Sequence, residues 1–205
     1  MSNRKIEYCK IHGEVDLVQL TQATYCCPHC LAGRATVSGK ERHTVTVGQT
    51  LPKPKLSVFL AGPIERRKDD QKPTLPQWRK EAVKWLELYT KDLNHFLVLS
   101  PEWGERPENW SYEKQVDWEI EALQLSTCIL CWIPRQLPLL PAFTTNIEVG
   151  EWLHSPKLIV GAPPDTPHTR YIQYRRKKLG LSWCTSLESC AIEATRFLRK
   201  VEENE

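Results

Sequence analysis

The sequence predicts an α/β protein with a five-stranded, parallel, doubly wound sheet of the flavodoxin-like kind, preceded by a small zinc-binding β module. From residue 56 onward, short apolar runs alternate with amphipathic helical segments, and most of these helical segments begin with a capping signal. Paired cysteine and histidine residues near the N-terminus predict the module. We therefore divide the chain into a module of residues 1–50 and a domain of residues 51–205.

Two short pairs of metal-ligand residues lie within the first 30 residues. Cys9 and His12 have the spacing C-x2-H, and Cys27 and Cys30 have the spacing C-x2-C. Two such pairs supply the four tetrahedral ligands that Zn²⁺ prefers, so we predict a structural zinc ion, and we expect no organic cofactor. A neighbouring cysteine or histidine as a replacement ligand, a reduced cysteine cluster without metal, and a catalytic zinc remain alternatives.

A proline-containing segment, residues 48–55, marks the predicted boundary because prolines cannot donate hydrogen bonds to a strand ladder. The run Arg42–Val47 before it is predicted as a short strand and falls in the N-terminal module. Beyond the boundary, the predicted strands are residues 56–61, 96–99, 127–133, 157–160 and, more weakly, 181–184.

Helices are predicted between and after these strands. The first is predicted to start at a capping box, residues 74–77, with proline in its first turn and with Trp78, Ala82, Trp85, Leu86 and Tyr89 on one face. The others are predicted at residues 112–125 after the cap Ser111, from Thr145, at residues 166–180 and from residue 185. In an open parallel sheet the ligand site lies at the carboxyl ends of the strands.

Charge and hydropathy argue against several partners. The chain has 28 basic and 25 acidic residues, a balance that does not make nucleic acid or a membrane the default partner. It contains no apolar run long enough to span a bilayer, and its first ten residues lack the apolar segment of a signal peptide. We expect a cytoplasmic protein without membrane contact. Nucleic acid stays open but is not favoured, and the basic run 175–178 would be its contact.

Chemically useful residues follow the predicted strands. Gly62 and Pro63 follow the first strand, Trp103 the second, Arg135 the third and Asp165 the fourth. These positions contain neither a serine–histidine pair nor a glycine-rich phosphate loop, which disfavours serine-hydrolase and P-loop chemistry.

Four motifs make the domain similar to a known family. They are FLAGPI at residues 59–64, Trp118 with Glu119, the strand at residues 129–133, and TNIEVG at residues 145–150. Together they resemble the nucleoside 2-deoxyribosyltransferase-like proteins over roughly residues 56–199. The resemblance implies an enzyme that cleaves or transfers at the N-glycosidic bond of a nucleoside or nucleotide. It also implies a homo-oligomer, because related enzymes build their sites with help from neighbouring subunits.

The resemblance assigns the nucleophile to Glu148, with Thr145 and Asn146 as substrate contacts. A carboxylate can form a glycosyl-enzyme ester through an oxocarbenium-like transition state. At a helix N-terminus, the helix dipole would help to keep this carboxylate ionised. Thr145-x-x-Glu148 also fits a capping box, in which the glutamate only ties down the start of its own helix. From the residues alone, both interpretations stand.

Glu119 borders the inward-facing stripe of its predicted helix, where an unpaired carboxylate is costly. It would either position the substrate or donate a proton to the leaving base, or it would pair with an arginine or with the backbone. The neighbouring Trp118 is a further predicted substrate contact.

The sequence departs from the classical transferases at two acidic positions. Six residues before the nucleophile, where those enzymes carry an aspartate, this chain has Ala142, and another acidic position appears as Thr127. Recognition of the base must therefore differ. The candidate replacements are Trp103, Trp132, Arg135 and Asp165.

Two further functions remain open. One is the same chemistry on a larger substrate, such as a nucleic-acid base or a dinucleotide, and the other is non-catalytic nucleotide binding. Transfer and hydrolysis differ only in which nucleophile reaches the intermediate, and the sequence does not decide between them.

We expect the purified protein to carry about one zinc ion per chain, because the two ligand pairs complete one tetrahedral site. Elemental analysis checks this, and the double variant Cys27→Ala, Cys30→Ala should lose the metal. A matched double change at Cys128 and Cys131, which lie in an apolar run, should not lose it. Wild-type protein without stoichiometric zinc, or a Cys27/Cys30 variant that keeps it, contradicts the assignment.

Overall fold

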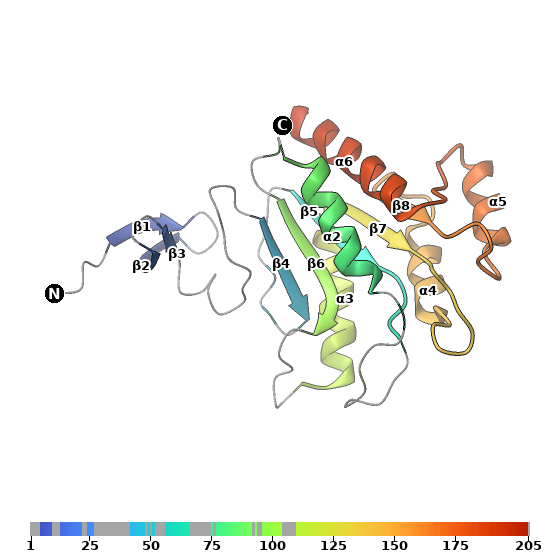
Figure 1. Ribbon diagram of the computed structural model, residues 1–205, viewed down its shortest axis with the longest axis horizontal. Helices are drawn as coiled ribbons and strands as arrows, with labels where there is room; N and C mark the ends of the chain where they lie inside the picture. The colour runs from blue at the N-terminus through green and yellow to red at the C-terminus, as the bar shows by residue number, and fades with distance from the viewer. Residues whose placement is uncertain are drawn as a thin grey trace.

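The computed structural model describes residues 5–9, 13–21, 24–26, 42–47, 49, 51, 56–65, 75, 77–91, 93, 96–103 and 110–204 (Figure 1). Its strands form two sheets. One is a three-stranded sheet of order β1-β2-β3, and the other is a five-stranded sheet of order β4-β6-β5-β7-β8.

The three-stranded sheet is antiparallel. It consists of β1 (Lys5–Cys9), β2 (Gly13–Thr21) and β3 (Thr24–Cys26). Cys9 ends β1 and pairs with Gly13, whereas His12, Cys27 and Cys30 lie outside the described residues. Within the described part of the chain, no group of three or more potential metal ligands comes together. The zinc site therefore stays a prediction.

The five-stranded sheet is parallel throughout, which confirms the predicted α/β class. Its strands are β4 (Arg42–Val47), β5 (Ser57–Ala61), β6 (Phe96–Trp103), β7 (Cys128–Trp132) and β8 (Leu158–Gly161). β5 lies at the centre, and Phe59 pairs with Leu99 of β6 and with Ile129 of β7. The central strands are apolar at almost every position because helices cover both faces of the sheet.

Two strands differ from the sequence prediction. Arg42–Val47 is a strand, but it pairs in parallel with β6, so the parallel sheet begins before the boundary placed at residue 50. Residues 181–184 form no strand, and only Cys184 pairs, in an isolated bridge with Gly161. The backbone of this segment is engaged elsewhere: Leu181 N donates to Arg176 O, and Ser182 O accepts from the Arg176 side chain.

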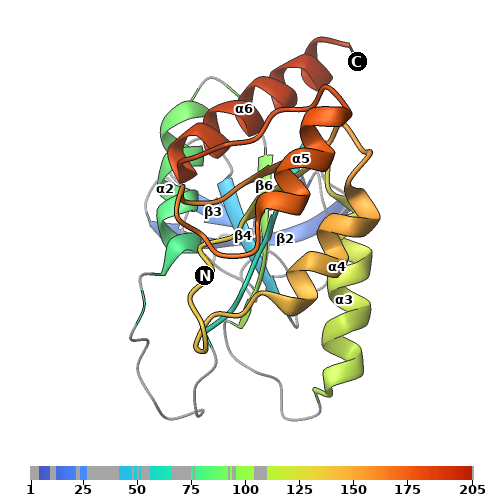
Figure 2. The same cartoon turned by 90° about the vertical axis from the view of Figure 1, so that its right-hand side faces the viewer.

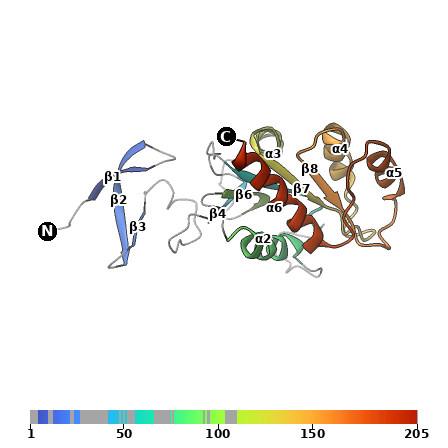
Figure 3. The same cartoon turned by 90° about the horizontal axis from the view of Figure 1, so that it is seen from above.

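Helices cover both faces of the parallel sheet. They are α2 (Trp78–Tyr89), α3 (Tyr112–Leu125), α4 (Phe143–Trp152), α5 (Arg170–Lys178) and α6 (Leu187–Glu203). α3 and α4 lie on one side of the sheet and α2 on the other, as Figures 2 and 3 show. α6 packs beside α2, and α5 contributes Ile172 to the α3–α4 side. Among the described helices, none combines the length and apolar character needed to cross a membrane.

The starts of the helices only partly follow the predictions. Ser111 caps α3 as predicted, because its hydroxyl accepts from Lys114 N at 3.3 Å. α6 begins after Ser186, whose partner in the capping box is Ser189. α4 begins at Phe143, two residues before the predicted start. α2 and α5 both start later than predicted: α2 begins at residue 78, after an N-cap residue without a side-chain cap bond, and α5 begins at residue 170 rather than 166.

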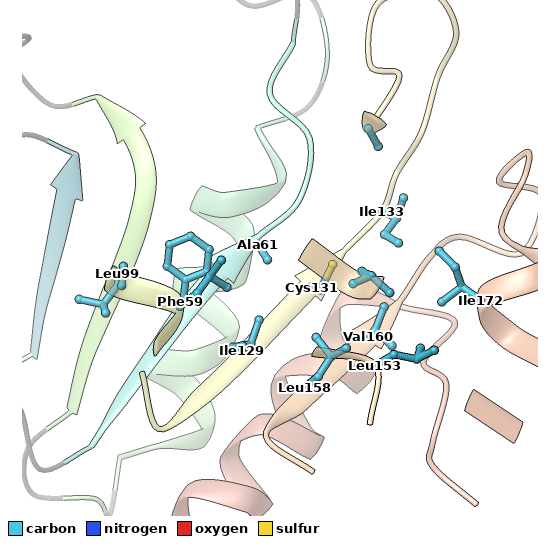
Figure 4. Close-up of a cluster of buried hydrophobic side chains, with 14 of the residues drawn as sticks. Phe59, Ala61, Leu99, Ile129, Cys131, Ile133, Leu153, Leu158, Val160 and Ile172 are labelled. Atoms are coloured by element: carbon cyan, nitrogen blue, oxygen red, sulfur yellow. The ribbon is translucent and has the colours of Figure 1, made fainter. Parts of the chain in front are cut away.

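Alternate residues of the central strands feed two hydrophobic clusters. Phe59 and Ala61 point to the α3–α4 side, where Figure 4 shows them with side chains from β6, β7 and β8. Val58 and Leu60 point to the opposite side and pack with the buried faces of α2 and α6. This alternation fixes which face each strand residue serves.

The residues of the basic run 175–178 differ in burial. Arg176 is 1% exposed and donates to the carbonyl oxygens of Leu153, Leu158 and Ser182. Lys177 and Lys178 are exposed at the end of α5. Arg176 is therefore part of the structural core, which removes it from any contact with nucleic acid.

We expect Gly161→Ala to destabilise the fold by about 1–3 kcal/mol, because overpacking forces backbone shifts. A Cβ atom at Gly161 would lie 2.4 Å from the carbonyl oxygen of Cys184. The matched control is Gly150→Ala in α4, where a Cβ would meet nothing within 4 Å. Urea unfolding should show a lower midpoint for Gly161→Ala and an unchanged or higher one for the control. Equal midpoints for the two variants would show that the bridge tolerates a side chain.

Candidate active site

A cavity of about 390 Å³ lies at the carboxyl ends of β5 and β6. The turn after β5 forms one wall, and α3 and the first turns of α4 form others. Lining residues include Gly62, Pro63, Gln115, Glu119, Phe143 and Glu148. The position agrees with the expectation for an open parallel sheet.

Gly62 is required by the shape of the turn after β5. Its φ of +146° is rarely adopted by residues with side chains. A Cβ atom there would lie 2.3 Å from the carbonyl oxygen of Trp132 and 2.6 Å from Cζ2 of Trp78. The turn can therefore pass close to the end of β7 only with glycine at this position.

Glu148 lines the cavity from the second turn of α4. Its Oε2 atom is buried and has no hydrogen-bond partner among the described residues. The pKa of Glu148 is raised to about 7, mainly by burial and then by the nearby Glu119, whereas Arg79 opposes the rise. The expected dipole effect does not dominate, because Glu148 lies beyond the first turn of the helix.

The capping-box interpretation of Glu148 is wrong. α4 begins at Phe143 with Ala142 as its N-cap residue, in the left-handed conformation and without a side-chain cap. Thr145 therefore lies inside the helix, where its buried Oγ1 has no hydrogen-bond partner within the described structure. Glu148 therefore does not form the capping box that the sequence allowed.

Glu119 lines the same cavity from α3. Its Oε1 atom accepts from Gln115 Nε2 at 2.9 Å, one helical turn earlier. Burial raises the pKa of Glu119, while the bond from Gln115 and the charge of Arg79 lower it. The partner that the sequence left open is thus an amide, and the cavity holds two electrostatically coupled carboxyl groups.

Two of the three predicted tryptophan contacts do not line this cavity. Trp118 packs in the core near Phe59, at 6.5 Å between ring centroids, and its Nε1 donates to Gln49 O at 2.8 Å. Trp132 is buried among the residues that pack against α2 and α6, and it borders a separate hollow of about 290 Å³.

Arg135 and Asn146 contact each other instead of the cavity. Arg135 Nη2 donates to Asn146 Oδ1 at 2.6 Å, and its other nitrogens donate to the carbonyl oxygens of Pro141, Pro167 and His168. The pair thereby ties the start of α4 to the loop after β8.

The other predicted base contacts contribute no described side chain to the cavity. Asp165 is exposed in the loop after β8, and the side chain of Trp103 lies outside the described part. Thr127 lies at the opposite end of β7, where its Oγ1 accepts from Ser57 N at 3.1 Å.

Sequence reasoning missed Arg79 and two aromatic residues at the cavity. Arg79 is buried and donates to carbonyl groups of the cavity wall. Its spacing from Ala82 and Leu86 places it on the buried stripe of α2, a signal that the sequence does contain. Tyr112 and Phe143 line the cavity and are 69% and 61% exposed.

One comparison with known proteins covers the elements that line this cavity. Residues 55–166 match the family model described as "Nucleoside 2-deoxyribosyltransferase like". The match spans more than half of the 205 residues and includes the turn after β5, α3 and α4. None of the curated proteins matches the chain. The chain belongs to the nucleoside 2-deoxyribosyltransferase-like family.

Proposed function

We propose that this protein cleaves or transfers at the N-glycosidic bond of a nucleoside, with Glu148 as the nucleophile. The observation that carries the proposal is the buried Glu148 oxygen without a hydrogen-bond partner among the described residues, in a cavity at the carboxyl edge of the sheet. A buried polar atom of this kind is costly unless a ligand or water completes it. Membership of the family supports the same assignment.

In the proposed first step, a carboxylate oxygen of Glu148 attacks the anomeric carbon of the sugar. The bond from that carbon to the base nitrogen breaks, and the base leaves with the electron pair and gains a proton. The product is a sugar ester of Glu148. In the second step, water or another base attacks the anomeric carbon, gives up a proton to the group that protonated the leaving base, and releases the Glu148 carboxylate, which gives hydrolysis or transfer.

Glu119 is the proposed donor of the proton to the leaving base. Burial raises the pKa of Glu119, which favours the protonated form that a general acid needs. Its bond to Gln115 fixes the orientation of the carboxyl group. Glu119 and Glu148 would then have opposite protonation states at the start of the reaction, although they share one cavity.

The composition of the wall favours an uncharged nucleoside over a nucleotide. The carboxyl groups of Glu119, Glu148 and Glu151 line the cavity, and its described lining contains no lysine, arginine or histidine. A phosphate group would meet carboxylates without a compensating cation there. Tyr112 and Phe143 offer aromatic surfaces at the cavity for stacking a base.

We expect Glu148→Gln to lower turnover on the order of a thousandfold or more, because the amide cannot form the sugar ester. Stability at neutral pH should be unchanged or higher, since the substitution removes a buried charge. Incubation with a panel of nucleosides, with and without an acceptor base, measures turnover by chromatography of the released base. Mass spectrometry of quenched wild type should find the sugar on the peptide that contains Glu148.

The matched control is Glu121→Gln, which changes an exposed glutamate of α3 and should retain wild-type turnover. A Glu148→Gln variant with most of its turnover, or wild type that turns over a nucleoside without a sugar adduct, would remove the proposed mechanism.

We expect kcat/KM to rise with pH through about 7, because only ionised Glu148 attacks, and to fall again once Glu119 loses the proton that it donates. The free energy of unfolding should fall as pH rises over the same range. The pKa of Glu148 rises from 4.5 to about 7 on folding. The stabilisation of the fold that comes from protonated Glu148 is therefore fully present below about pH 4.5 and is lost as pH rises through about 7. Comparing the pH dependence of thermal unfolding for wild type and Glu148→Gln isolates this contribution. Superimposable stability curves for the two proteins would contradict the raised pKa.

A further inference from the structure

Arg79 holds the cavity wall through its backbone. Its side chain is 2% exposed, and its nitrogens donate to the carbonyl oxygens of Leu60 at 3.1 Å, Gly62 at 2.5 Å and Pro63 at 3.2 Å. The guanidinium also lies 4.3 Å from the centre of the Trp78 ring. The fork of N–H donors on one planar group suits this set of acceptors, which a single ammonium group would satisfy poorly.

The positive charge of Arg79 is only weakly paired. Within the described structure its ion-pair partner is Glu102, whose Oε1 lies 3.5 Å from Nη1 and whose side chain is 36% exposed. The carbonyl groups that accept hydrogen bonds from Arg79 provide the rest of the stabilisation of its charge. A buried, incompletely neutralised guanidinium therefore acts on other carboxyl groups nearby.

Charged and titratable groups on several elements act on Glu148. Glu119 from α3 and Glu151 from α4 disfavour its ionised form, Cys131 of β7 is also coupled to it, and Arg79 from α2 favours ionisation. Within the described structure, Arg79 is the cation that counters the acidic groups around the cavity. Glu102, near the end of β6, in turn acts on Arg79.

We propose that Arg79 is a positioning residue of this site: it anchors the Gly62–Pro63 wall and supplies the positive charge that favours ionised Glu148, while Glu102 moderates that charge. The kinetic consequence rests on the proposed function, because it requires Glu148 to be the nucleophile. The charge coupling between Arg79 and Glu148 does not require this. The two inferences therefore have separate measurements.

The decisive experiment follows the ionisation of Glu148 without substrate. Carbon-13 NMR of the full-length protein, with labelled glutamate side chains, gives its titration curve, and Glu148→Gln identifies the signal. Glu102→Gln should move the midpoint down by about half a pH unit, because Arg79 loses its counter-charge. Arg79→Gln should move it up by about one unit or more. The exposed Glu81→Gln on α2 is the control and should leave the midpoint in place.

A second pair of measurements separates anchoring from charge. Arg79→Lys keeps the charge but loses the fork, so it should retain a near-wild-type Glu148 midpoint and raise KM several-fold by loosening the wall. Arg79→Gln should also move the acidic limb of the pH–rate profile upward. If the buried Arg79 variants do not fold, the half-exposed Glu102 variant still decides the charge coupling.

The inference is overturned if Glu102→Gln titrates like wild type, or if folded Arg79→Gln shows no upward shift of Glu148. It is equally overturned if the Glu81→Gln control moves the midpoint as far as Glu102→Gln does. If the Glu148 titration moves as expected but no nucleoside is turned over, the coupling stands and the proposed function fails.

Discussion

Buried carbonyl groups at the ends of strands and helices must find donors, and this constraint organises the domain. Three buried arginines provide them. Arg79 serves the turn after β5, Arg135 serves the loops before α4 and α5, and Arg176 links the end of α4, the start of β8 and the segment after α5. Each guanidinium satisfies several carbonyl oxygens at once, which a hydrophobic residue could not do. The loops that shape the cavity are thus fixed by side chains that look like ordinary surface cations in the sequence.

The site combines requirements that oppose each other. The proposed nucleophile, Glu148, must be ionised, yet burial and a second carboxyl group favour its protonated form. A fully solvated glutamate would avoid this conflict, but water would also occupy the position that the sugar needs. The cavity resolves the conflict by placing Glu148 near its point of half-ionisation. Small changes in neighbouring charge then alter the fraction of molecules in which Glu148 is ionised.

The sequence predicted those features that local patterns encode. Buried parallel strands appear as apolar runs, and Ser111 shows the start of α3 directly. The pairing of Arg42–Val47 with β6 depends on a partner more than fifty residues away, and its alternating threonine and valine residues fit an edge strand of either sheet. Trp118 and Glu119 form one sequence motif, but successive helical residues point about 100° apart, so only the glutamate lines the cavity. To predict from the sequence that Arg79 lies at the site, one would have to know which carbonyl groups lie above the buried stripe of α2.

The bridge between Gly161 and Cys184 has a consequence for association between molecules. The outer edge of a terminal strand is a template on which a foreign extended chain can add. Here Cys184 N donates to Val160 O, and Ala162 N donates to Cys184 O, each at 3.1 Å. β8 has only four residues, so one bridging residue occupies much of its free edge. The connection to α6 thereby blocks templated growth of the sheet at this edge with far less chain than an additional strand would need.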